Sequence, residues 1–193
     1  MQNKKAKTSQ IISEIIANRW SSRSYDPERE VNKNDIISVC EAARWAPSSY
    51  NEQPWNFIIW NKFENNLEWE RALNCLSEWN QKWAKNAPVL IAAMSINKFR
   101  KNGKTNDWAD YDTGAAVENL CLQATHLGLN THQIGGFSVE KFNEYFNIPP
   151  INKLLSIVSM GYTTNKRLID DEFINLKDRE RISMKENFFF NKF

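Results

Sequence analysis

The sequence predicts a fold of class α+β or mixed α/β. Some segments place apolar residues at the three-and-four spacing of a helix, and others are compact apolar runs of strand length. The two kinds alternate only partly along the chain, which argues against a regular doubly wound sheet. With 41% apolar and 25% charged residues among 193, the composition is that of a globular protein. We therefore expect a single domain over residues 1–193.

Each expected helix has its own sequence signal. Four isoleucines form a stripe in the first, and an asparagine at position 32 or 34 can cap the second. Prolines at positions 47, 88 and 149 follow the second, third and fifth expected helices. Gly128 is a C-cap for the fourth helix, and Ser138 is an N-cap for the fifth. The expected helices span residues 9–18, 32 or 34 to 46, 64–85, 108–127 and 138–148.

Four apolar runs are expected to form strands. Residues 57–60 are compact and aromatic, residues 89–94 follow a proline, and residues 154–160 are apolar with two serines. Residues 131–134 are a shorter candidate. Residues 99–107 are charged and contain a glycine, which is typical of a surface loop.

The chain ends on aromatic residues within a highly charged segment. Phe188, Phe189, Phe190 and Phe193 would expose a large apolar surface if the protein were a monomer. We therefore expect these side chains to pack on the surface of a partner.

Composition argues against several classes of function. The 25 basic and 23 acidic residues give a net charge of +2, which does not indicate nucleic-acid binding. No run approaches the roughly 20 apolar residues of a membrane span, and no signal peptide is recognised, so a cytoplasmic location is expected. Cys40, Cys75 and Cys121 are far apart, so neither a disulfide framework nor a metal site is expected.

No dinucleotide, phosphate-loop, esterase or zinc-protease signature is present, but four other segments suit ligand binding. Residues 19–25 place Arg19 and Arg23 among hydroxyl groups on a turn, which suits a phosphate group. A solvated charged loop is the alternative. Residues 46–55 hold Ser, Asn and Gln side chains between two prolines, which suits a polar heteroaromatic ring. An ordinary capped turn is the alternative.

The other two segments lie further along the chain. Gly135 and Gly136 follow an expected strand, where the backbone could approach a flat ligand closely. A plain turn before the next helix is the alternative. Lys177 and Arg179 form a second cation pair, for which a solvated charge run is the alternative.

Together these segments resemble the FMN-dependent nitroreductase family. The most specific similarity is an Ala-Pro-Ser-Ser-x-Asn-x-Gln-Pro-Trp loop, which residues 46–55 match throughout. An Arg-x-Ser-x-Arg turn over residues 19–23, an Asn-Gln-x-Trp stretch from Asn80, a Gly-Gly-Phe turn from Gly135 and a late Lys-x-Arg add to it. The resemblance covers about residues 9–181.

This resemblance implies an α+β fold in which a mixed, mostly antiparallel sheet lies between helices as a three-layer sandwich. It implies an interlocked homodimer with one FMN in each of two clefts at the interface. The activity implied is that of an NAD(P)H oxidoreductase. Hydride passes from NADH or NADPH to flavin N5 and then, in a ping-pong scheme, to a nitroaromatic compound, a quinone or a similar acceptor. Because the flavin carries this chemistry, no catalytic side chain and no metal are expected.

Residue roles follow from the same resemblance. The phosphate and ribityl end of FMN would be held by Arg19, Ser21, Lys177 and Arg179. Arg23 would lie toward the pyrimidine edge and tune the flavin through its charge. Pro47, Ser48 and Asn51 would reach the FMN of the other subunit. The backbone of Gly135 and Gly136 would face the N5 side of the ring. The complete set of expected cofactor-binding residues is Arg19, Trp20, Ser21, Arg23, Pro47, Ser48, Ser49, Asn51, Asn80, Gly135, Gly136, Lys177 and Arg179.

Two departures from the family pattern leave the acceptor open. Trp20 stands where a small or polar residue is common, and Gly135 stands where some members have Glu. An FMN-dependent dehalogenase, an enal reductase, and a non-catalytic flavin-binding storage or sensor protein therefore remain alternatives.

Overall fold

The computed structural model describes residues 4–164 and 179–193, and its centre is a four-stranded antiparallel sheet of order β1-β2-β4-β3. The strands are β1 (Trp55–Asn61), β2 (Val89–Ile96), β3 (Asn130–Ile134) and β4 (Asn152–Gly161). One isolated parallel bridge, between Ser21 and Thr131, lies beside β3. The pairing is therefore mixed and mostly antiparallel, as the resemblance implied.

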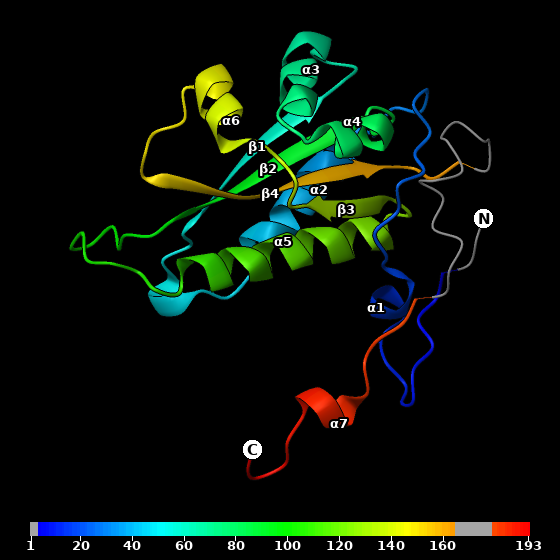
Figure 1. Ribbon diagram of the computed structural model, residues 1–193, viewed down its shortest axis with the longest axis vertical. Coiled ribbons are helices and arrows are strands. Elements are labelled where there is room, and N and C mark those ends of the chain that lie inside the picture. The colour runs from blue at the N-terminus through cyan, green and yellow to red at the C-terminus, as the bar shows by residue number, and fades with distance from the viewer. Residues whose placement is uncertain (1–3, 165–178) are drawn as a thin grey trace.

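Helices cover both faces of this sheet (Figure 1). On one face lie α2 (Lys33–Arg44) and α5 (Ala109–His126), and on the other lie α3 (Asn66–Asn74), α4 (Glu78–Ala84) and α6 (Val139–Phe146). The layers are helix, sheet and helix, which confirms the predicted three-layer α+β sandwich.

Strand β2 shows how the two cores arise from the sequence. Its side chains alternate, so that Leu90 and Ala92 pack toward α3, α4 and α6 while Ile91 and Ala93 pack toward α2 and α5. Both sets are buried completely, because helices cover the strand on both sides. This explains why residues 89–94 form a continuous apolar run.

The predicted caps are confirmed by their geometry. Asn32 Oδ1 accepts a hydrogen bond from the Asn34 backbone N–H at 2.8 Å, and Ser138 Oγ accepts one from the Lys141 N–H at 3.2 Å. Gly128 adopts φ +75° directly after α5, a conformation that glycine reaches without strain.

The single helix expected over residues 64–85 is wrong, because α3 and α4 are separated by a break. The Ser138 N–H donates to the Cys75 carbonyl at 2.7 Å, and the Ser77 N–H donates to the Gly136 carbonyl at 2.9 Å. These bonds to a distant turn replace helical hydrogen bonds at the break. They also bring α4 against the glycine pair.

The helix expected over residues 9–18 is wrong in its first half, since α1 covers only Glu14–Asn18. Ile11 is fully exposed and Ile16 is half exposed, so the isoleucine stripe has no core to pack on. Helices this short gain little from their own hydrogen bonds and depend on tertiary packing.

The C-terminal residues form an arm that projects from the body, with α7 (Met184–Asn187) at its centre (Figure 1). All of residues 181–193 are exposed, and Phe190 and Phe193 are 85% and 103% exposed. The expected packing of these phenylalanines on a partner stays a prediction. Within the described part of the chain, no helix is both long and apolar enough to span a membrane.

Candidate functional site

Residues 19–24 leave α1 and run beside β3, the edge strand of the sheet. The bridge between Ser21 and Thr131 attaches this segment to β3. The ring of His132 adds a second attachment, because its Nδ1 lies 3.1 Å from the Ser22 carbonyl oxygen and donates to it. The two predicted cations, Arg19 and Arg23, are thereby held next to one strand.

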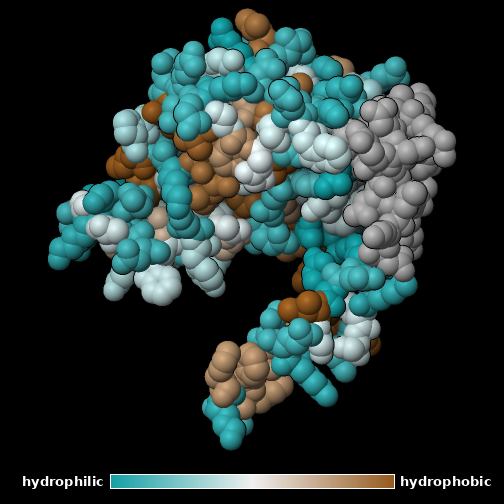
Figure 2. All heavy atoms as spheres, in the orientation of Figure 1, coloured by the Kyte–Doolittle hydropathy of each residue, from teal (hydrophilic) through white to brown (hydrophobic). Residues whose placement is uncertain are grey.

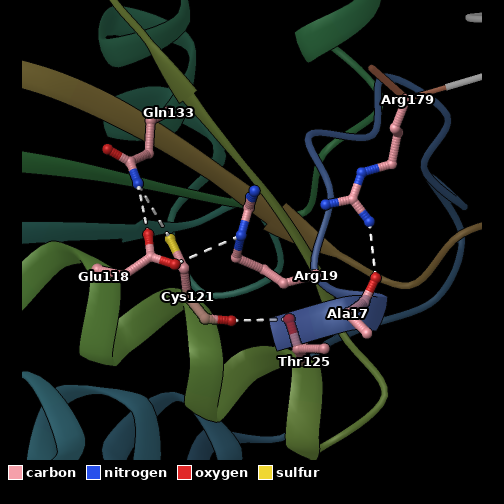
Figure 3. Close-up of polar contacts among 7 residues, drawn as sticks. All are labelled: Ala17, Arg19, Glu118, Cys121, Thr125, Gln133 and Arg179. Carbon is pink, nitrogen blue, oxygen red and sulfur yellow. Dashed lines mark hydrogen bonds and ion pairs between the residues drawn. The ribbon is translucent and has the colours of Figure 1, made fainter. Parts of the chain in front are cut away.

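Arg19 lies between a carboxylate and a second arginine (Figure 3). Its Nε is 3.4 Å from Glu118 Oε1 on α5. Arg179 comes from the opposite end of the sequence, and its Nη1 donates to the carbonyls of Lys4 and Ala17 at 2.8 and 2.7 Å. Burial, and then the nearby Arg19 and Arg181, lower the pKa of Arg179 from its ordinary value. Arg19 and Arg179 are therefore neighbours, and their expected role at the FMN phosphate stays a prediction.

Within residues 4–164 and 179–193, the charge of these two arginines is only partly neutralised. Among the described residues, Arg19 is paired with one carboxylate, that of Glu118, and Arg179 is bonded to carbonyl groups alone. Such a pair of cations is suited to an anion with two negative charges. Lys177, the fourth residue expected here, lies outside the described residues.

Arg23, Trp83 and His132 form a stacked group deeper in the site. The guanidinium carbon of Arg23 is 5.9 Å from the centre of the Trp83 ring. The Trp83 ring lies 4.6 Å from that of His132, with 35° between their planes. Arg23 Nε is buried and has no hydrogen-bond partner within the described structure. An unpaired buried donor is costly, so an acceptor on a bound ligand would stabilise it.

His132 is uncharged near neutral pH. Burial is the largest cause, and together with the positive charges of Arg23 and Arg19 it lowers the pKa of the imidazole to about 4. The hydrogen bond to the Ser22 carbonyl acts in the opposite direction but is the weaker effect. The imidazole therefore holds the segment of residues 19–24 without adding a third charge.

Asn80 and the glycine pair form the other side of the site. Asn80 Nδ2 on α4 donates to the Gly136 carbonyl at 3.1 Å. A Cβ at Gly136 would lie 2.7 Å from that nitrogen and 3.1 Å from Ser77 Oγ, so any larger residue here would have to displace the Asn80 side chain. A Cβ at Gly135 would meet no atom within 4 Å. The backbone at Gly135 is therefore open to a ligand, while that at Gly136 is closed by the protein.

Trp20 lies within the segment of residues 19–24, but the predicted residues of the loop 47–51 lie elsewhere. The turn η1 (Ser49–Asn51) is attached near the start of α5, where the Ser49 N–H donates to Asp112 Oδ2 at 2.9 Å. Two residues of the turn, Tyr50 and Asn51, have φ values of 53° and 56°, an uncommon conformation outside glycine.

We call Arg19, Glu118, Gln133 and Arg179 the Arg19 cluster. Among the described residues, no hydrogen bond or ion pair joins the loop of residues 47–51 to it. Pro47, Ser48, Ser49 and Asn51 therefore do not complete that cluster within one chain. The expected role of Pro47, Ser48 and Asn51 at the FMN of another subunit stays a prediction, as does the expected role of Ser49 in binding the cofactor.

Sequence reasoning missed three residues of the site: Glu118, His132 and Gln133. His132 and Gln133 lie on β3, with Ile134 alone between them and the glycine pair, and that position is a signal that could have marked them. Glu118 has no such signal, because its partner Arg19 is about a hundred positions away and only the packing of α5 brings them together.

Comparison with known proteins identifies the group to which this fold and site belong. Residues 16–162 match the model of the nitroreductase family. The chain belongs to that family. A putative NADH dehydrogenase/NAD(P)H nitroreductase of Archaeoglobus fulgidus is 30% identical over 169 residues, 86% of this chain and 90% of that protein. An oxygen-insensitive NADPH nitroreductase of Helicobacter pylori is 28% identical over 184 residues, 77% of this chain and 85% of that protein.

A solved structure described as an oxidoreductase containing FMN has the same fold. Its TM-score is 0.91 at 29% identity, over 100% of this chain and 98% of the other. The match to the nitroreductase family includes the turn of residues 19–24, the loop of residues 46–55 and the glycine pair, but it ends before Arg179.

Proposed function

We propose that this chain binds FMN along the edge of β3 and uses it to pass two electrons from NADH or NADPH to a small electron-poor acceptor. As a member of the nitroreductase family it is an FMN-dependent NAD(P)H oxidoreductase. Two further points are proposed. The first is that the acceptor is a nitroaromatic compound, a quinone or a similar molecule, and the second is the role of each residue. The names of the Archaeoglobus and Helicobacter relatives support this class of acceptor.

The observation that carries the proposal is the pair of neighbouring arginines that together have one carboxylate partner, that of Glu118, among the residues that the structure describes. The phosphate of FMN carries close to two negative charges at pH 7 and has three acceptor oxygens. Arg19 and Arg179 would hold it, with Ser21 beside them. Each charge-assisted hydrogen bond contributes about 1.5 to 3 kcal/mol, so losing either arginine should weaken FMN much more than riboflavin.

The rest of the site fits the flavin ring. The unpaired Nε of Arg23 would donate to an acceptor on the pyrimidine side. The backbone at Gly135 leaves open space in which a flat ring can approach. Asn80 and Gly136, bonded to each other, form a wall that fixes this turn. In the view of Figure 2, apolar atoms gather between α6 and α4, over the strands.

When bound, FMN supplies the hydride-transfer chemistry, and the protein residues bind and orient it. Arg23 places a positive charge where negative charge develops on reduction, which favours the reduced state. His132 stays neutral and fixes the backbone of Ser22. No side chain is assigned proton transfer or covalent catalysis.

We also infer that the active form is a homodimer in which the loop of residues 47–51 completes the site of the partner. The loop is held by hydrogen bonds from the Ser49 N–H to Asp112 and from the Gln53 N–H to Ser48, and none of its hydrogen bonds among the described residues reaches the Arg19 cluster. The exposed phenylalanines of the C-terminal arm supply apolar surface for such an interface.

Steady-state kinetics with several acceptors would test the proposed activity. Oxidation of NADH and of NADPH would be followed with a nitroaromatic compound, a quinone, an enal and a haloaromatic compound. We expect turnover with the first two and parallel double-reciprocal plots, which indicate that donor and acceptor use one site in turn. Turnover with the enal alone or with the haloaromatic compound alone would show that the protein is an enal reductase or a dehalogenase instead. Flavin reduction without turnover on any acceptor would favour a storage or sensor protein.

A further inference from the structure

We propose that Glu118 is an internal competitor of the FMN phosphate. Its carboxylate holds Arg19 in the flavin-free protein and opposes the phosphate when FMN binds. The inference rests on the proposed function, because it takes Arg19 and Arg179 as the phosphate-binding pair. It goes further because it states that Glu118, a residue of α5, lowers the affinity of the protein for FMN.

Glu118 contacts two elements at once (Figure 3). Its Oε1 lies 3.4 Å from Arg19 Nε, and its Oε2 accepts a hydrogen bond from Gln133 Nε2 on β3 at 3.4 Å. The same Gln133 nitrogen also lies 3.6 Å from Cys121 Sγ, one helical turn further along α5. The carboxylate is thus held at the place where residues 19–24 and β3 meet α5.

The contact with Arg19 is of a kind that a ligand can replace. Both distances are long for charge-assisted hydrogen bonds. The Glu118 side chain is 46% exposed, whereas that of Arg19 is 19% exposed. Exposed ion pairs of this kind contribute little to stability. Glu118 can therefore turn into solvent while Arg19 stays in the site.

The charges around Glu118 and Arg19 determine how Glu118 affects the binding of FMN. Arg19 and Arg179 are close enough that Arg19 helps to lower the pKa of Arg179, so the two cations repel each other. Without ligand, the Glu118 carboxylate reduces this repulsion. With FMN bound, the phosphate takes over that function and is itself repelled by Glu118. Removing the carboxylate should therefore weaken the flavin-free state and strengthen the FMN complex.

The test compares FMN with riboflavin, which lacks the phosphate. Dissociation constants of both flavins for the flavin-free full-length protein would be measured by fluorescence at low salt. The variants are Glu118→Gln, Arg19→Gln and the double variant. Glu68→Gln on α3 is the matched control, since Glu68 is a partly exposed glutamate paired with Arg71 at 2.7 Å on the opposite face of the sheet.

We expect Glu118→Gln to tighten FMN by about 3- to 10-fold, the range for a partly screened charge interaction, and to leave riboflavin unchanged. Glu68→Gln should change neither flavin. In the Arg19→Gln background the effect of Glu118→Gln should be clearly smaller, because the two residues act through one contact. Glu118→Gln should also change the melting temperature of the flavin-free protein only slightly and enlarge the rise that FMN produces.

Each opposing result has a distinct meaning. If Glu118→Gln weakens FMN, Glu118 positions Arg19 for the phosphate, and the competitor role is overturned while the phosphate site stands. An unchanged FMN affinity in Glu118→Gln, beside a clear loss in Arg19→Gln, overturns it as well. If Arg19→Gln affects FMN and riboflavin equally, the phosphate site itself is misplaced and the residue roles under the proposed function fail.

Discussion

Arg23 is a charged side chain whose Nε is buried next to an aromatic ring and lacks a partner. A fixed cation binds the negatively charged reduced flavin better than the neutral oxidised form. Arg23→Gln keeps hydrogen-bond donors but removes the charge. Because about 1.4 kcal/mol corresponds to about 30 mV for a two-electron couple, we expect the flavin potential to fall by a few tens of millivolts. Spectroelectrochemical titration measures it, and an unchanged potential with a large loss of FMN would show that Arg23 only anchors the cofactor.

His132 makes stability depend on pH in a defined window. The folded protein holds its pKa at about 4, against 6.5 for an unperturbed histidine, so the unfolded chain binds more protons between these values. The free energy of unfolding therefore falls as pH drops from about 6.5 toward 4. Urea unfolding of the wild type and of His132→Gln at several pH values measures this. We expect a shallower fall in the variant, and two parallel pH profiles would rule out the assigned protonation state.

At the residue scale, the sequence could predict what is local and not what is distant. Arg19, Arg23 and the glycine pair belong to short patterns, and the structure places them around β3. Glu118 could not be found, because its carboxylate meets Arg19 only after α5 packs against the sheet. The role of each residue toward FMN stays a prediction until the flavin-binding experiments are done.

At the scale of elements, the break between α3 and α4 shows what periodicity cannot reveal. Trp69 and Trp83 are both buried, so the apolar pattern that suggested one helix is present in the structure. The helix stops because Cys75 and Ser77 pair with the distant glycine turn. Short-range sequence patterns do not indicate such pairing between distant segments. The strands were predicted closely, because the signal for each lies within one short run of residues.

The glycine turn offers a matched pair of substitutions. Gly136→Ala would push its Cβ into Asn80 Nδ2 at 2.7 Å and displace that side chain. We expect it to destabilise the fold by about 1 to 2 kcal/mol. Gly135→Ala meets no atom and should change the free energy of unfolding by less than about 0.5 kcal/mol.

If the flavin ring lies against the backbone at Gly135, Gly135→Ala should nevertheless weaken both FMN and riboflavin, because the added methyl group occupies the space of the ring. Urea unfolding and flavin titration of the two variants separate these effects. Equal flavin affinity in Gly135→Ala and the wild type would remove Gly135 from the site.

At the scale of the whole molecule, the exposed apolar residues point to assembly. The fold class followed from the apolar patterns and the three-layer arrangement from the family resemblance. An interface between chains cannot be derived from one sequence, since its partner surface is unknown. Phe190 and Phe193 lie on a projecting arm, and Ile11 near the other end of the chain is fully exposed. Such side chains are costly in water and are typical of an interface.

Deleting residues 187–193 tests the role of the arm. Because the deletion removes all four terminal phenylalanines, we expect it to weaken dimerisation and FMN retention together. Light scattering at low micromolar concentration and the flavin content of the purified protein measure both. A truncated protein that keeps the mass and the FMN content of the full chain would show that the arm has no part in the interface.

The central claim is that this chain holds FMN and exchanges hydride through it. The most direct measurement is the absorbance of the FMN-loaded protein, mixed with NADH or with NADPH in the absence of oxygen and then with a quinone. We predict that the oxidised-flavin band disappears with at least one of the two donors and returns when the quinone is added. A protein that fails to retain FMN, or whose flavin stays oxidised with both donors, would contradict the account.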